Sequence, residues 1–425
     1  METEILRVLD PAEVERLDRA PIDEEIVPDA RRIVMAVRSG GDDALLDFAI
    51  EHDGLDADDP LVLESNAIAE AAGSIPDDAY HALERAAERV VTSANAQIDR
   101  LDALETAIPG GRSGHHIEPL HRAGCYAPGG GYPLPSSVLM TAIPARVAGV
   151  EELVVASPDP DPVTLAAADI CHVDMVVTAG GAHAMGALGF GTESVPRCDV
   201  VVGPGGPWVT AGKKAITGYV RTDFMAGPTE LVIVADGSAD PSLIAADLIA
   251  QAEHAPEAWP VLLTPSASLI RAADREIVAQ LADLPTAAVA RRAFERGFAV
   301  LVEDLGSGID LCESLAPEHV QLAGERAIHH RDRLTRYGTL FVGQQTPEAF
   351  GDYGLGPNHV LPTGGAARFT GGLSVFDFLR MPTWLELTAE PLEPAIAENV
   401  TTIARLEGLE GHARSVERRL EDRDG

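Results

Sequence analysis

Two residues with metal-ligand chemistry lie close together in the stretch IAQAEHAP (249–256). Gln251 and His254 are three residues apart, so they share one face of a helix, and that helix must end near Pro256. An imidazole beside an amide oxygen provides half of a zinc site. Alternatively, His254 is a charged group that is favourable near the helix C-terminus, or a packed core residue. The spacing alone leaves these interpretations open.

The stretch LAPEHVQL (315–322) places Glu318 directly before His319. An adjacent carboxylate and imidazole suit proton transfer, because their ordinary pKa values differ by about 2. The other interpretation is a solvated loop, since Pro317 biases the preceding residue away from helix.

A long glycine-rich stretch, AFGDYGLGPNHVLPTGGAARFTGGLS (349–374), is the most conspicuous predicted loop. Long loops of this kind often carry function. Asp352 offers a carboxylate to a metal, and His359 offers a hydrogen bond or a base. A purely structural loop is the alternative.

Two further stretches carry weaker signals. Glu407 and His412 lie in LEGLEGHARS (406–415), which taken alone is typical of a surface helix. Cys125 is a candidate nucleophile for an aldehyde, although a small buried cysteine is the simpler interpretation.

The turns TAGGAHAMGALGFG and VVGPGGPWVT are rich enough in glycine to cradle phosphates. Neither gives GxGxxG after a strand with an acidic residue about 20 positions later, so the usual dinucleotide fingerprint is absent.

The elements that must position these residues alternate between strand and helix. Short valine-rich runs end in Gly or Pro, with helical segments between them, which predicts βαβ units and parallel sheets. Ligands of such sheets gather at the carboxyl ends of the strands. The runs are ELVVASP (152–158), DMVVTAGG (174–181), DVVVGPGG (199–206), TELVIVADG (229–237), VLLTP (261–265), FAVLVED (298–304) and GTLFVG (338–343).

Composition limits the partners and the compartment. The 425 residues suffice for more than one domain, and 67 acidic against 32 basic residues give a formal charge of −35. Such a surface repels nucleic acid and anionic membranes, and it suits a salty cytoplasm. Four dispersed cysteines suit a reducing compartment, and neither a signal peptide nor a membrane-spanning run is found. We expect a soluble, cytoplasmic, halophilic protein.

Taken together and in order, these motifs resemble the histidinol dehydrogenase family over nearly the whole chain. The matching stretches are YAPGG with PSS, GG-A-A with FGTESVP, VGPG, AGP-E, QAEH, APEH, GDY-G-NHVLPTGG, FLRM and EGLEGH.

The resemblance implies an α/β fold of two incomplete Rossmann-like parallel-sheet domains, with small helical C-terminal pieces, in a domain-swapped homodimer. It implies one domain on the NAD side, from 1–20, 126–228 and 358–373. The second, from 25–125 and 230–357, carries the zinc and the Glu–His pair. A small helical segment, 374–399, and a swapped helical segment, 400–425, follow.

The resemblance also implies zinc and NAD as cofactors. It assigns four zinc ligands that also contact substrate: Gln251, His254, Asp352 and, from the other subunit, His412. His319 is then the base for the alcohol proton, and Glu318 activates water for the second oxidation. The remaining implied contacts are Thr229, His359 and Glu407 to substrate and Tyr126, His183 and Gly206 to NAD.

Three implied positions depart from the family pattern, which has Gln at His183, Asn at Gly206 and Ser at Thr229. The resemblance implies zinc-dependent, NAD-linked oxidation of L-histidinol via histidinal to L-histidine as the first choice. The departures leave a paralogue that oxidises another small alcohol, such as a sulfopropanediol, as the alternative. Two other classes remain: a thiol-dependent aldehyde dehydrogenase that uses Cys125, and a metal-binding protein without catalysis.

Overall fold

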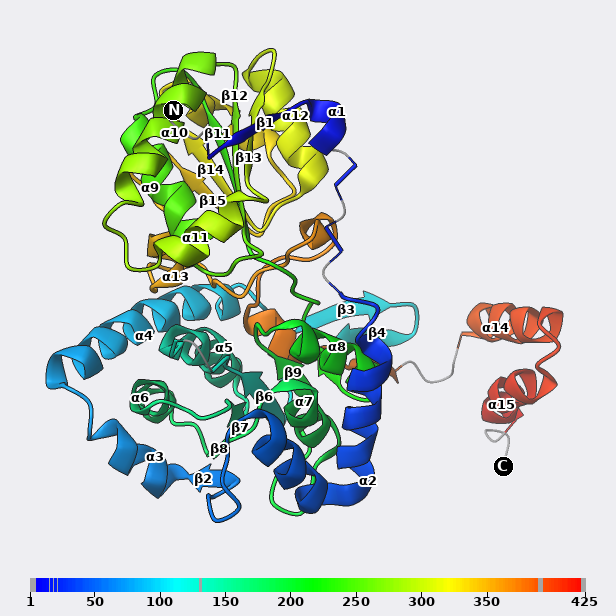
Figure 1. The fold of residues 1–425 in the computed structure, drawn as a ribbon. Coiled ribbons are helices and arrows are strands. Elements are labelled where there is room, and N and C mark those ends of the chain that lie inside the picture. The colour runs from blue at the N-terminus through cyan, green and yellow to red at the C-terminus, as the bar shows by residue number, and fades with distance from the viewer. Residues whose placement is uncertain are drawn as a thin grey trace. The chain divides into compact units, whose positions relative to one another are not determined.

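The computed structural model of the chain contains two compact units (Figure 1). The first comprises Met1–Ile98 with Leu120–Phe378, and the second comprises Asp99–Pro119 with Leu379–Gly425. No helix in the described part of the chain is both long and apolar enough to cross a bilayer. The structure describes residues 5–14, 16–17, 19–20, 22–129, 132–388 and 393–421.

The first sheet of the larger unit is wholly parallel and has six strands in the order β1-β13-β12-β11-β14-β15. It is buried on both faces, which explains its nearly continuous apolar runs. In β11, Leu231 and Ile233 face one core, whereas Val232 and Val234 face the other. The strands are β1 (Arg7–Leu9), β11 (Glu230–Ala235), β12 (Trp259–Thr264), β13 (Phe298–Leu301), β14 (His319–Ala323) and β15 (Thr339–Val342).

Helices cover both faces of this sheet (Figure 1). One face packs against α9 (Pro241–Ala252), α10 (Ala267–Gln280) and α11 (Ala287–Phe294). The opposite face packs against α1 (Pro11–Val14), α12 (Leu305–Leu315) and η1 (Ala327–Arg333).

The second sheet of the same unit has the order β10-β9-β6-β7-β8-β2, and only the edge strand β2 runs antiparallel. The valines of its central strands pack against α2, α7 and α8. In Figure 1, α3, α4, α5 and α6 lie on the other side. The strands are β2 (Val62–Glu64), β6 (Arg122–Tyr126), β7 (Glu152–Ala156), β8 (Met175–Val177), β9 (Val200–Val202) and β10 (Arg221–Thr222).

The second sheet and the helices around it form the second lobe of the larger unit. These helices are α2 (Val27–His52), α3 (Ser65–Ala72), α4 (Asp77–Ile98), α5 (Pro135–Ala148), α6 (Pro162–Ile170), α7 (Gly181–Phe190) and α8 (Pro207–Ile216). Three short helices complete the unit: α13 (Ala349–Asp352), η2 (Ala366–Arg368) and η3 (Val375–Phe378).

The second unit combines two small antiparallel sheets with two helices. Its three-stranded sheet joins β17 (Thr383–Leu387), β4 (Gly111–His115) and β3 (Leu104–Ile108). A two-stranded sheet joins β5 (Glu118–Pro119) and β16 (Leu379–Arg380), and α14 (Pro394–Leu406) and α15 (Glu410–Glu421) follow.

The α/β prediction is confirmed, but strand pairing corrects the sheet membership implied by the predicted ranges. Residues 1–20 are predicted to join 126–228, yet Arg7 of β1 pairs with Phe298 of β13. Residues 25–125 are predicted to join 230–357, yet β2 pairs with β8 and α2 packs on α7. Edge strands are placed by backbone hydrogen bonds, which a hydrophobic pattern does not encode.

The prediction of helix over 374–399 is also wrong in part. Residues Thr383–Leu387 form β17, whose register pairs Thr383 with His115. This pairing joins residues more than 250 positions apart, so nothing local in the sequence indicates it.

Candidate active site

One cavity of the larger unit, of about 190 Å³, brings half of the predicted site residues together. It opens at the amino ends of β11 and β14, since Glu230 and His319 are the first residues of these strands. In contrast, the part of its wall that comes from the second sheet consists of loops that follow the carboxyl ends of β6 and β9. Its walls include Pro128, Ser136, Ser137, Pro204, Gly205, Gly227, Thr229, His254, Glu318, His319, Asp352, His359, Leu361 and Thr363.

The cavity therefore lies at the carboxyl ends of the strands in one sheet, where ligands are expected, and at the amino ends in the other. Helix α9 runs back from the end of β11 towards the start of β12, so its last turn reaches the amino ends of the strands. That geometry places His254, which directly follows the α9 C-cap Glu253, on the cavity wall.

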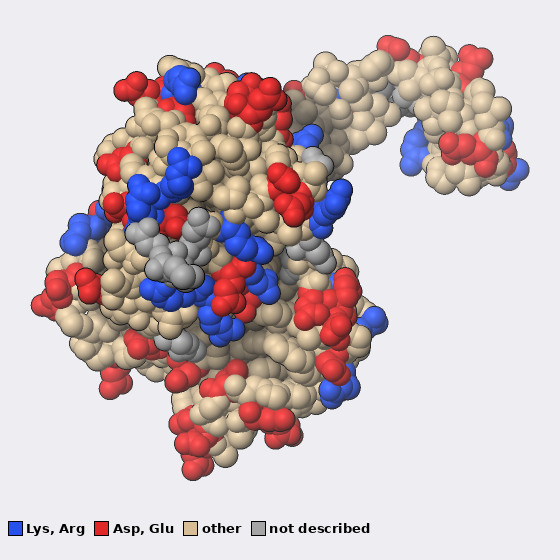
Figure 2. Space-filling model, turned by 45° about the horizontal axis from the view of Figure 1, so that its top comes forward, with Lys and Arg blue, Asp and Glu red and all other residues tan. Residues whose placement is uncertain are grey.

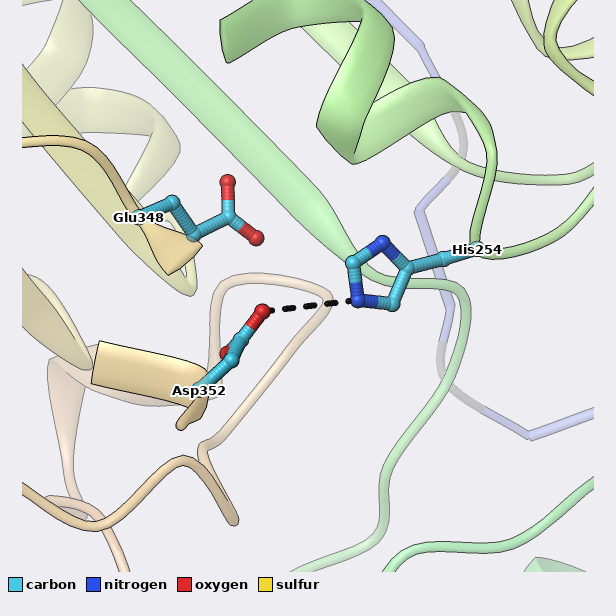
Figure 3. A group of neighbouring side chains, drawn as sticks. All are labelled: His254, Glu348 and Asp352. Atoms are coloured by element: carbon cyan, nitrogen blue, oxygen red, sulfur yellow. Dashed lines mark ion pairs between the residues drawn. The ribbon is translucent and has the colours of Figure 1, made fainter. Parts of the chain in front are cut away.

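His254 faces two carboxylates, that of Asp352 on the cavity wall and that of Glu348 beside it (Figure 3). Its Nδ1 lies 2.9 Å from the Ala250 carbonyl oxygen, which only accepts, so Nδ1 carries the proton. The Nε2 atom then points at Asp352 Oδ2, 3.5 Å away. Ligand atoms of His254, Glu348 and Asp352 lie within 4.8 Å of one another. Two carboxylates and an imidazole nitrogen pointing at one spot could hold a metal ion there.

The pKa shifts describe the same negative site. Burial alone would lower the pKa of His254, but Asp352 and Glu348 outweigh it and raise the pKa to about 10. Burial raises the pKa of Glu348 well above its ordinary range, and Asp352 adds to this. Burial also opposes ionisation of Asp352. The hydrogen bond to His254, together with the charges of the nearby histidines, outweighs this and lowers the pKa of Asp352. The electrostatics therefore favour a proton or a metal ion between these groups.

Gln251 is fully buried beside this group. Its Nε2 lies 2.9 Å from Thr229 Oγ1, which leaves its oxygen facing the Glu348 carboxylate. The opposite amide orientation places the nitrogen 2.9 and 3.0 Å from the two Glu348 oxygens. In the first orientation, Gln251 adds an oxygen to the imidazole and carboxylates, a mixed N/O set that suits zinc. The residues present thus fit a divalent cation.

Glu318 and His319 form a buried pair on the adjoining wall of the cavity. Glu318 Oε2 accepts hydrogen bonds from the Thr229 hydroxyl at 2.6 Å and from the Glu230 N–H at 2.8 Å. Burial nevertheless raises the pKa of Glu318 to about 8. His319 is 3% exposed, and burial lowers its pKa to about 4.

The tautomer of His319 follows from one contact. Its Nδ1 lies 3.1 Å from the Glu230 carbonyl oxygen, so the ring proton resides on Nδ1. At neutral pH, the lone pair of Nε2 is therefore free to accept a proton, which is the state a general base requires.

His359 occupies the same cavity in a similar state. Its Nδ1 donates to the Asp352 backbone oxygen at 2.9 Å, and burial lowers its pKa. This bond joins both ends of the loop from Asp352 to His359 and orients the imidazole towards the site.

The predicted cofactor residues lie in the second lobe. Tyr126 is buried at the end of β6, and burial raises its pKa. His183 lines a separate cavity of about 300 Å³, where its Nε2 lies 2.7 Å from Asp53 Oδ2. Gly206 is the N-cap of α8, and a Cβ atom there would meet nothing within 4 Å.

Two predicted residues belong to the second unit. Glu407 is the C-cap of α14, and His412 lies in the first turns of α15. Both are exposed.

Sequence reasoning missed Glu348, Glu230 and Asp53. Only Glu348 leaves a local signal, because it precedes Asp352 by four residues, the spacing that places two helical side chains on one face. The structure disfavours Cys125 as a nucleophile, because the thiol is fully buried and burial raises its pKa to about 12.

Fold and cavity together define an α/β enzyme that combines a buried acid–base pair with side chains able to hold a divalent cation. The family model for histidinol dehydrogenase matches residues 18–420. A histidinol dehydrogenase of Thermus thermophilus is 44% identical over 94% of this chain and 95% of its own length. The chain belongs to the histidinol dehydrogenase family.

Two other likenesses agree with this assignment. A histidinol dehydrogenase of Halobacterium salinarum is 43% identical over 93% of each chain. The crystal structure of a histidinol dehydrogenase from Elizabethkingia anophelis matches with a TM-score of 0.92 and 28% identity over all of both chains. A betaine aldehyde dehydrogenase of Staphylococcus aureus, at 13% identity and a TM-score of 0.52, shares the fold alone.

Proposed function

We propose that this protein oxidises L-histidinol through L-histidinal to L-histidine, the last step of histidine biosynthesis. One alcohol, two NAD and one water give one carboxylate, two NADH and three protons. The main support for the proposal is that a neutral His319, beside Glu318, lines the same cavity as His254 and Asp352. Family membership supplies the substrate.

His319 acts in the first oxidation. Its free Nε2 takes the hydroxyl proton while the carbinol hydride passes to the first NAD. The Nδ1–H bond to the Glu230 carbonyl holds the ring in the required tautomer and orientation. Because burial lowers the pKa of His319 to about 4, the ring is unprotonated and ready before substrate binds.

Glu318 acts in the second oxidation. With a pKa raised to about 8, its carboxyl exchanges a proton readily near neutral pH. It takes a proton from the water that adds to the aldehyde, and the hydrate then yields its hydride to the second NAD. The Thr229 hydroxyl and the Glu230 N–H hold the carboxylate in place.

Gln251, His254 and Asp352 would hold zinc, together with His412 of the partner subunit in a domain-swapped homodimer. When bound, zinc supplies a positive template that orients the imidazole and amine of the substrate. His359, Thr229 and, from the partner subunit, Glu407 would complete the substrate site. We place NAD along Tyr126, His183 and Gly206.

The surface and the thiols support a salty, reducing cytoplasm as the cellular setting. Acidic side chains spread over the face drawn in Figure 2, with basic ones between them. The net charge of −35 suits a salty medium, in which counterions screen the repulsion. All four cysteines are free and buried, which supports a reducing cytoplasm.

The test is NADH formation from L-histidinol by the zinc-loaded protein in molar KCl. We expect about two NADH per histidinol consumed and histidine as product. The His319→Asn variant should retain zinc but lose turnover. Activity on another small alcohol without turnover of histidinol would replace this proposal with the paralogue, which the comparisons do not favour.

A further inference from the structure

A single residue, Glu230, contacts both members of the acid–base pair through its backbone. Its N–H donates to Glu318 Oε2 at 2.8 Å, and its carbonyl oxygen lies 3.1 Å from His319 Nδ1. One peptide segment therefore sets the position of the carboxylate and the tautomer of the imidazole. Any shift of Glu230 changes both at once.

The side chain of Glu230 holds the turns around this pair. Its carboxylate is buried and accepts from the Gly364 N–H at 3.1 Å and from the Glu318 N–H at 3.4 Å. A third partner, the Arg19 guanidinium, binds both carboxylate oxygens, with Nε at 3.1 Å and Nη2 at 2.5 Å. This fork arrangement is stronger and more directional than a single ionic contact.

Arg19 also holds the other side of the turn that carries the pair. Its Nη1 donates at 2.6 Å to the carbonyl of Leu315, the last residue of α12. The next residue, Ala316, has a φ of 47° and a ψ of 59°, a left-handed conformation that costs free energy for a residue with a Cβ. Such a turn persists only when its surroundings hold it, and Arg19 and Glu230 contact it on both sides.

An anchor for the N-terminal segment alone would not need this arrangement. That segment is already tied to the sheet by β1 and by Asp274, which accepts from the N–H groups of Ile5 and Leu6. The Arg19 and Glu230 side chains are 11% and 5% exposed, so both charges lose much of their hydration. A buried pair of this kind contributes little net stability compared with apolar residues, and its geometry is the feature that apolar residues cannot supply.

We propose that Arg19 and Glu230 are positioning residues for the oxidation, which hold the 315–319 turn so that Glu318 and His319 face the substrate together. This inference rests on the proposed function. It adds a segment from the N-terminus, remote in sequence from the cavity, to the machinery of the site.

The test compares kcat, KM for histidinol and zinc affinity in Glu230→Gln, Arg19→Met and Arg19→Lys. Neither residue contacts Gln251, His254 or Asp352 through a described hydrogen bond or ion pair, so zinc affinity and KM should change less than threefold. Misplacing a reacting group by about 1 Å costs up to 100-fold in rate, so kcat should fall at least tenfold in the first two variants. Arg19→Lys should recover part of this loss, because it keeps the charge but not the fork.

The matched control is Asp274→Asn, which loosens the same N-terminal segment away from the catalytic turn. It should lower thermal stability without lowering kcat. If folded Glu230→Gln and Arg19→Met keep the wild-type kcat, or if Asp274→Asn lowers kcat equally, the pair is only structural and the inference is overturned.

The design separates this inference from the proposed function. Wild-type turnover of histidinol tests the function before any variant is compared. If wild-type protein does not turn over histidinol, a crystal structure of Glu230→Gln decides the inference instead. Displaced Glu318 and His319 side chains would support it, and unchanged positions would refute it.

Discussion

Replacing Asp247 with Asn is expected to stabilise the protein at neutral pH, although no charge partner is gained. Asp247 lies in α9, is 9% exposed and accepts a hydrogen bond from Gln321 Nε2 at 2.6 Å. Burial raises its pKa from 3.8 to about 6, and the bond from Gln321 only partly offsets this. The folded protein therefore holds a proton on Asp247 that the unfolded chain releases at lower pH.

The direction and size of this change in the free energy of unfolding follow from proton linkage. Between pH 3.8 and about 6, the folded state binds more protons than the unfolded state, so the free energy of unfolding falls as pH rises. At about 1.4 kcal/mol per pH unit, the Asp247 contribution costs roughly 3 kcal/mol above pH 6, and this value is an upper bound. Asn keeps the shape and an acceptor oxygen without the charge. The variant should thus exceed the wild type by about 1–3 kcal/mol at pH 7 and match it near pH 4.

The assay is denaturant unfolding of both proteins from pH 4 to pH 8 in constant molar KCl. Taking the difference between the two proteins cancels groups that titrate alike in both. The Asp236→Asn variant is the control of opposite sign: burial opposes ionisation of Asp236, but hydrogen bonds from Ser238, Arg326 and Ala327 outweigh it and lower its pKa. That variant should be less stable than wild type at pH 7. A stability difference for Asp247→Asn that is the same at pH 4 and pH 8 would refute the reasoning.

His319→Asn should lower kcat by about 100-fold or more, as expected for loss of a general base, whereas Cys125→Ala should change it less than threefold; the reverse order would favour thiol chemistry. Asp352→Asn should weaken zinc binding by at least tenfold in a chelator competition, and equal affinity would exclude Asp352 as a ligand. Raising KCl from dilute buffer to molar concentration should raise the melting temperature, because screening reduces self-repulsion; a flat response would contradict halophilic adaptation.

Much of the fold could be predicted because buried parallel strands are continuous apolar runs. ELVVASP, DVVVGPGG and TELVIVADG all contain strands where expected. Strand β14 was not predicted, since its run HVQLA begins at a histidine and is interrupted by Gln321. Both polar residues are buried and hydrogen-bonded, so their burial depends on tertiary contacts that a local pattern does not show.

In the candidate site, too, some residues could be predicted from the sequence and others could not. Motif spacing brought Gln251, His254 and Asp352 to attention because each lies in an unusual local stretch. Glu230 and Arg19 had no such signal: they are separated by 211 residues and meet only through the folding of the first sheet. Resemblance to the family named the reacting groups, whereas the contacts that hold them could be identified only from the structure.

Two histidines that open on one cavity carry opposite pKa shifts, and the difference separates their roles. His254 lies at the end of a helix, beside two carboxylates, and its pKa is raised to about 10. His319 starts a buried strand, and burial lowers its pKa to about 4. The proposed mechanism needs both environments, a negative one for the metal ion and a buried one that keeps the base neutral. The end of α9 supplies the first and the start of β14 supplies the second, and both lie at the amino ends of strands of the first sheet.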